Sequence, residues 1–162
     1  MSAIDRLTEA NARYLADFPG PRPVRPALQL AVVACMDSRL ALFPALGLNI
    51  GDAHLIRNAG AIATPDVLRS LAISQHKLGT REIALIGHTD CGMSNFDDTA
   101  FRSELAAESG QQPDWDVPGF TDVAASVAES VARIRACGWL PHRDSVRGFV
   151  FDVRTAQITE VG

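Results

Sequence analysis

The chain has 162 residues, of which 47% are hydrophobic and 21% charged, a composition typical of globular proteins and unlike that of disordered chains. Its formal net charge of −4 argues against a general nucleic-acid-binding surface, because such surfaces are usually basic. No apolar run approaches the roughly 20 residues of a membrane helix, and the N-terminus lacks the basic and apolar regions of a secretory signal. We therefore expect one cytoplasmic domain over residues 1–162, with neither a nucleic-acid nor a membrane partner.

The N-terminal region is predicted to be an arm. Residues 3–17 favour a helix, because their apolar side chains can share one stripe: Ile4, Leu7, Tyr14 and Leu15. The stretch PGPRPVRP, residues 19–26, contains four prolines and should be an extended connector. The arm of residues 1–26 can therefore pack away from its own core, on a partner subunit.

After this connector, short aliphatic segments alternate with helical ones. Strands are predicted over residues 28–36, 52–60, 81–87 and 146–153, and residues 157–161 can pair with the last of these after a turn. Helices are predicted within residues 37–48, 64–79, 97–110 and 121–138. In the second of these, Thr64 suits the N-cap, Pro65 the first turn, and Gly79 the end. This alternation predicts an α/β fold with a central, mostly parallel β-sheet flanked by helices.

Two of the predicted strands end in polar side chains that can bind a ligand. The first ends in ACMDSR, which supplies Cys35, Asp37 and Arg39, and the third ends in GHTDCG, which supplies His88 and Cys91. In an open α/β sheet, ligands bind beyond the carboxyl ends of the strands. If these strands are neighbours, both cysteines and the histidine converge at one edge of the sheet.

Two thiolates and one imidazole are a good ligand set for zinc, which prefers tetrahedral sites and keeps one position for water when it is catalytic. Asp37 lies two residues after Cys35 and can itself be the fourth ligand. Alternatively, Arg39 holds Asp37 through two parallel hydrogen bonds and leaves the fourth position to water. Zinc brings the pKa of such a water to about 7, and Asp37 would then accept a hydrogen bond from the resulting hydroxide and orient it.

The segments CMDSR, RNAG and GHTDCG, in this order and spacing, resemble the β-class carbonic anhydrases, and the resemblance extends from the first strand to the end of the chain. It implies that Cys35, His88 and Cys91 bind one zinc ion per subunit and that Asp37 and Arg39 form a catalytic dyad. The implied activity is that of a carbonate dehydratase, a zinc lyase that reversibly hydrates carbon dioxide to bicarbonate and a proton through zinc-bound hydroxide. It further implies that Asp37 can swing onto zinc and close the enzyme.

The resemblance also implies how the protein assembles. Members of this family are dimers or tetramers of dimers, and their N-terminal helix commonly packs on the partner. This agrees with the arm of residues 1–26, so we expect a homodimer or a tetramer of dimers built from single β-carbonic-anhydrase-like domains.

The RNAG segment, residues 57–60, favours a tight turn after the second strand, with Gly60 supplying backbone freedom. We expect Asn58 and the backbone near Ala59 and Gly60 to shape the substrate pocket.

Two alternatives remain open from the sequence. The chain is shorter than common members of the family, and some short relatives hydrolyse carbonyl sulfide or carbon disulfide, so the same zinc site can serve that reaction. A non-catalytic structural or regulatory zinc module, closed by Asp37, is the second alternative. Arg39 argues against a closed module, because it is placed to pull Asp37 away from the ion.

Overall fold

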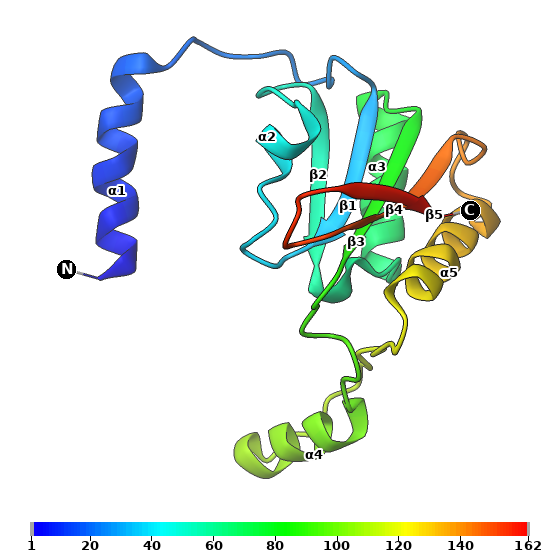
Figure 1. The fold of residues 1–162 in the computed structure, drawn as a ribbon. Coiled ribbons are helices and arrows are strands. Elements are labelled where there is room, and N and C mark those ends of the chain that lie inside the picture. The colour runs from blue at the N-terminus through cyan, green and yellow to red at the C-terminus, as the bar shows by residue number, and fades with distance from the viewer. Residues whose placement is uncertain (1, 162) are drawn as a thin grey trace.

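Five strands form one sheet at the centre of the computed structural model, which describes residues 2–161 (Figure 1). The strands are β1 (Leu30–Cys35), β2 (Ala53–Asn58), β3 (Glu82–His88), β4 (Val146–Phe151) and β5 (Ile158–Val161). Their order across the sheet is β2-β1-β3-β4-β5; the first four are parallel, and β5 runs antiparallel to β4. The predicted mostly parallel sheet is confirmed, as is the pairing of the last two strands.

The helices begin and end close to the capping residues predicted from the sequence. They are α1 (Ala3–Tyr14), α2 (Leu42–Leu46), α3 (Pro65–Leu78), α4 (Asp98–Ser109) and α5 (Val123–Ala136), with single 3₁₀ turns at Leu15–Asp17 and Ala59–Ala61. The Thr64 side chain accepts a hydrogen bond from the Val67 amide, and Gly79 ends α3 in the left-handed conformation, as predicted. The Asp97 side chain caps α4 in the same way.

Strand β1 is the most enclosed part of the sheet. Its residues from Ala31 to Cys35 are all buried, because helices cover one face and α2 with its preceding loop covers the other. On the first face, Val33 packs in one cluster with residues of α3 and α5. On the second face, Val32 and Cys35 pack with Leu40 and Leu42. A continuous apolar run is therefore required at β1 rather than an alternating one.

Helix α5 packs closely on β3 and β4. A Cβ atom on Gly148 would lie 2.5 Å from Cγ1 of Val127, and one on Gly87 would lie 2.7 Å from Cγ2 of the same valine. Glycine is needed at both positions because a real side chain would push the helix off the sheet. This close packing fixes the end of β3, where His88 lies.

Helix α1 stands apart from the sheet in Figure 1 and buries none of its residues. Its apolar side chains are unusually exposed, with Ile4 at 72% and Leu7 at 69%. An amphipathic helix with an uncovered apolar stripe is stable only when another surface covers it. The packing of this arm on a partner subunit stays a prediction.

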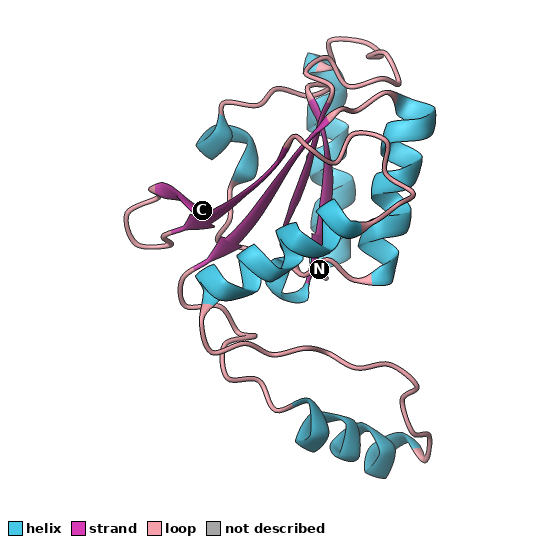
Figure 2. Ribbon diagram, turned by 90° about the vertical axis from the view of Figure 1, so that its right-hand side faces the viewer, coloured by secondary structure: helices cyan, strands magenta, loops and turns pink. Residues whose placement is uncertain are grey.

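Helix α4 lies at the end of a long loop that extends away from the sheet (Figures 1 and 2). Like α1, it contains no buried residue. Within residues 2–161, no helix combines the length and hydropathy that a membrane crossing requires.

Candidate metal centre

The site lies where three parallel strands end. Strand β1 pairs with β2 on one side and β3 on the other, with Cys35 opposite Asn58 and Ala34 opposite Ile86. The carboxyl ends of all three strands therefore meet at one edge of the sheet. Cys35 is the last residue of β1, and His88 is the last residue of β3.

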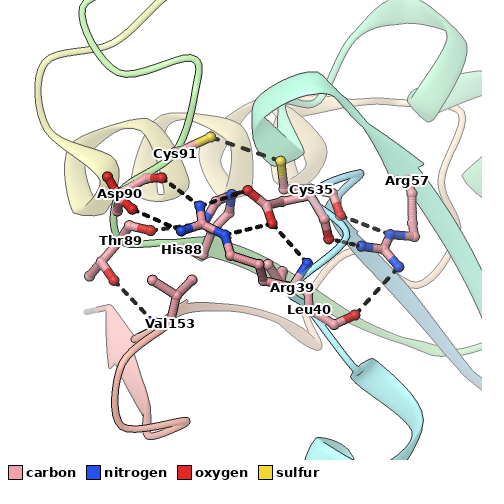
Figure 3. Close-up of polar contacts among 10 residues, drawn as sticks. Cys35, Arg39, Leu40, Arg57, His88, Thr89, Asp90, Cys91 and Val153 are labelled. Carbon is pink, nitrogen blue, oxygen red and sulfur yellow. Dashed lines mark hydrogen bonds and ion pairs between the residues drawn. The ribbon is translucent and has the colours of Figure 1, made fainter.

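The predicted ligand atoms converge. The sulfur atoms of Cys35 and Cys91 and a ring nitrogen of His88 all lie within 4.8 Å of one another, and all three residues are buried (Figure 3). The two sulfur atoms are 3.9 Å apart. A tetrahedral zinc ion with Zn–S bonds of about 2.3 Å separates its two sulfur ligands by about 3.8 Å. The cysteine pair therefore has the spacing that zinc requires.

The imidazole of His88 is oriented for metal binding. Its Nδ1 atom lies 2.9 Å from the carbonyl oxygen of Thr89, which can only accept a hydrogen bond, so Nδ1 carries the proton. The other ring nitrogen, Nε2, is then the one with a free electron pair. Nε2 is buried without a hydrogen-bond partner, which is costly for a polar atom unless a cation binds it.

The two thiols have different pKa values. Burial alone raises the pKa of the Cys35 thiol, but the His88 side chain and the backbone at Asp37 and Gly60 favour the thiolate and lower that pKa to about 7. Burial raises the pKa of Cys91 to about 11, and the nearby Cys35 adds to this increase. Without a cation, Cys35 is therefore about half ionised near pH 7 while Cys91 stays protonated. A divalent cation would stabilise both thiolates and use the free electron pair of His88, so zinc fits this donor set.

Arg39 holds Asp37 beside the ligand atoms. The Nε and Nη2 atoms of Arg39 donate to the two carboxylate oxygens of Asp37 at 3.0 and 2.8 Å, and the Arg39 backbone amide donates at 2.9 Å. These bonds keep the pKa of Asp37 well below its usual range. The Oδ2 atom of Asp37 lies 3.8 Å from Nε2 of His88. Asp37 therefore faces the centre while it is bound to Arg39.

Asp90 contacts Arg39, an interaction that was not predicted from the sequence. The Nη1 atom of Arg39 donates to the Asp90 carboxylate, and Nη2 donates to the Asp90 carbonyl, both at 2.8 Å (Figure 3). Asp90 lies between two ligands in GHTDCG, and its spacing from Arg39 gives no sign of an interaction. Only the convergence of the strand ends brings the two residues together.

Arg57 is a second residue that was missed. Its guanidinium donates to the backbone carbonyls of Cys35 at 2.8 Å, Asp37 at 2.6 Å and Leu40 at 3.5 Å (Figure 3). It therefore fixes the loop that carries the first ligand and the Asp37–Arg39 pair. The one available signal was its position next to Asn58 at the end of the neighbouring strand.

The RNAG turn has an internal structure. The amide side chain of Asn58 donates to the Ile62 carbonyl at 2.8 Å and accepts from the Ile62 amide at 3.1 Å, which closes the turn over Ala59. Gly60 has a φ of 84°, and a Cβ atom there would lie 3.0 Å from the Ile62 side chain. The contribution of Asn58, Ala59 and Gly60 to the substrate pocket stays a prediction.

Comparisons with known proteins agree with this geometry. A model of the carbonic anhydrase family matches residues 30–137, which include every residue of the site. The chain is 45% identical over 161 residues to β-carbonic anhydrase 1 of Mycobacterium tuberculosis, covering 99% of each chain. Its structure is similar to that of a carbonic anhydrase from Streptococcus mutans, with a TM-score of 0.92 and 40% identity over 100% of this chain and 99% of the other.

A relative with lower sequence identity is named for a different activity. The chain is 32% identical over 151 residues to a carbon disulfide hydrolase of Acidithiobacillus thiooxidans, covering 80% of this chain and 75% of the relative.

The two thiol pKa values predict how many protons zinc displaces from the metal-free protein. At about pH 8, binding should release about two protons, one from Cys91 and one from the water that zinc would bind, because the Cys35 thiol with its pKa of about 7 is already largely ionised. At about pH 6 that water stays largely protonated, and release should still be about two protons or more, because Cys91, most of Cys35 and, through its raised pKa, His88 each lose a proton.

Calorimetric titration in buffers that differ in ionisation enthalpy measures this number. The Cys137→Ala variant is the control, because Cys137 lies outside the cluster at the end of α5 and should give the same values. Release of about one proton or fewer at about pH 6 would contradict the assignment of both cysteines as ligands.

Proposed function

The chain belongs to the β-class carbonic anhydrase family, and we propose that it interconverts carbon dioxide and bicarbonate at the centre formed by Cys35, His88 and Cys91. One observation carries the proposal. The three buried ligand atoms lie beside Asp37, which is hydrogen-bonded to Arg39. The chain that carries them matches a carbonic anhydrase over 99% of its length. The corresponding enzyme class is a carbonate dehydratase.

Zinc is the metal that this donor set favours, with one ion in each subunit. When bound, it acts as a Lewis acid that makes water a nucleophile near neutral pH. The contribution of the protein is to hold the ion with two thiolates and one imidazole, and to leave Asp37 free to bind water. Among residues 2–161, the cluster of ligand atoms within 4.8 Å consists of the two cysteines and the histidine, and this supports an arrangement in which Asp37 is not a ligand.

Asp37 is proposed to orient the attacking water, and Arg39 to hold Asp37 in place. Because the pKa of Asp37 is well below its usual range, its carboxylate stays ionised and accepts a hydrogen bond without removing the proton. The water's proton then passes to solvent or buffer. A carboxylate fixed through both oxygens keeps one orientation, so the water is held in position before carbon dioxide arrives.

Hydrolysis of carbon disulfide or carbonyl sulfide is the second candidate, because one relative is named a carbon disulfide hydrolase. These molecules also present an electrophilic carbon to a nucleophilic water. The higher identity and fuller coverage of the carbonic anhydrase relative favour carbon dioxide. A non-catalytic zinc module is less favoured, because Arg39 engages Asp37 through two side-chain bonds.

The uncovered apolar stripe of α1 supports an assembly through the N-terminal arm. Ile4 and Leu7 are more than two-thirds exposed, and within residues 2–161 nothing buries any residue of α1. We therefore propose that the arm packs on a partner subunit in a homodimer, and that such dimers can associate further.

Replacing both Ile4 and Leu7 by aspartate should convert the dimer to monomer, because two charges would have to be buried in the interface. Sedimentation velocity measures the change. Arg13→Asp is the matched control, since residue 13 lies half a turn round the helix from Ile4 and the dimer should survive. A wild-type protein that is monomeric at micromolar concentration, or a double variant that remains dimeric, would refute the proposal.

Stopped-flow hydration of carbon dioxide tests the proposed function. Zinc-loaded protein should be active, with a rate that rises from about pH 6.5 to about pH 9, because the attacking water must first lose its proton. Cys35→Ala should lose zinc and nearly all activity, whereas Cys137→Ala should keep both. Asp37→Asn should keep zinc and lose about 100-fold or more in rate, as expected when the group that positions the nucleophile is removed.

Two outcomes would redirect the assignment. Full activity in zinc-free Cys35→Ala protein would refute the proposed site. Zinc-loaded protein that releases sulfide from carbon disulfide but does not hydrate carbon dioxide would establish the second candidate instead.

A further inference from the structure

Arg39 connects the two segments that carry the metal ligands. Four hydrogen bonds leave its guanidinium, two to the carboxylate of Asp37 and two to the carboxylate and carbonyl of Asp90. Asp37 belongs to the segment after β1 and Asp90 to the segment after β3, so the arginine spans 51 residues of sequence. A guanidinium bound on two edges has little freedom to rotate, because its donors have a fixed fork geometry.

Asp90 is itself held in position. Its φ angle is 54°, in the left-handed region that aspartate and asparagine tolerate better than most residues. The residue before it, Thr89, is fixed to the end of β4, since its amide donates to the Phe151 carbonyl at 3.0 Å and its hydroxyl accepts from the Val153 amide at 3.1 Å. The carboxylate and carbonyl of Asp90 are therefore presented to Arg39 from a backbone that β4 supports.

From this geometry we propose that Asp90 is a positioning residue, which holds the Arg39 guanidinium so that Arg39 in turn holds Asp37 beside the metal centre. The inference rests on the proposed roles of Asp37 and Arg39. Asp90 acts only through Arg39, because its carboxylate contacts the guanidinium and no ligand atom. Without the Asp90 carboxylate, the guanidinium keeps Asp37 and the Asp90 carbonyl but loses the charged partner of Nη1.

The Asp90 side chain is 69% exposed, so its ion pair contributes little to the stability of the fold. The expected effect is therefore on the orientation of Arg39 and not on unfolding. A merely structural role of Asp90 would instead change the free energy of unfolding, and the effect of its substitution on kcat would not depend on Arg39.

The experiment is a double-mutant cycle on zinc-loaded protein with its zinc content measured. Asp90→Asn should lower kcat for carbon dioxide hydration by about two- to fivefold. In an Arg39→Ala background, the same substitution should have no further effect. Asparagine is chosen because it tolerates the positive φ that alanine does not. Asp144→Asn is the control: it removes one exposed carboxylate from the loop before β4 and should leave kcat unchanged.

A second readout does not depend on turnover. In ¹⁵N-labelled, zinc-loaded protein, the Nη–H groups of Arg39 should give separate, slowly exchanging signals, assigned by their loss in Arg39→Ala. These signals should merge or broaden in Asp90→Asn and persist in Asp144→Asn.

An effect of Asp90→Asn that is equal in both backgrounds would overturn the proposal, as would unchanged Arg39 signals in that variant. If no variant hydrates carbon dioxide, the proposed function fails, and the NMR signals still decide whether Asp90 positions Arg39.

Discussion

The metal centre depends on the position of β1 between β2 and β3. This arrangement ends three parallel strands at one edge and places Cys35 opposite Asn58 and close to the end of β3. The central position of β1 buries both of its faces, as its continuous aliphatic run requires. Helix α5 packs on β3 at Gly87 and on β4 at Gly148, and this fixes the end of β3, where His88 lies. The order and packing of the strands therefore bring the three ligand residues together.

The charges of the ligand residues and of two arginines explain how the site is arranged. Two buried thiols and a buried imidazole nitrogen without a hydrogen-bond partner are unfavourable in an apolar cluster unless a cation joins them. Two arginines organise the surrounding loops. Arg57 donates to backbone carbonyls of the loop after β1, and Arg39 binds the carboxylate that faces the centre. Arg39 thus fixes the position of the carboxylate, and the thiolates of Cys35 and Cys91 would hold the metal.

The sequence predicted the fold class and the convergence of Cys35, His88 and Cys91, and the roles of these residues stay predictions. Thr64, Pro65 and Gly79 delimit α3 because capping is a local interaction, and the spacing in GHTDCG places two ligands on one turn. The contacts of Arg57 and Asp90 could not be predicted, because their partners lie 17 to 51 residues away and depend on strand order. The same limit applies to the exposed apolar stripe of α1, because the local sequence pattern does not identify the surface that covers it.

The coordination of zinc in the loaded protein decides whether Asp37 is a zinc ligand or stays bound to Arg39. A crystal structure at about pH 8.5, together with X-ray absorption at the zinc edge, would give the ligand set. We expect two sulfur atoms, one nitrogen of His88 and one oxygen from water, with Asp37 still bound to Arg39. Coordination of zinc by Asp37 at that pH, with Arg39 released, would contradict it.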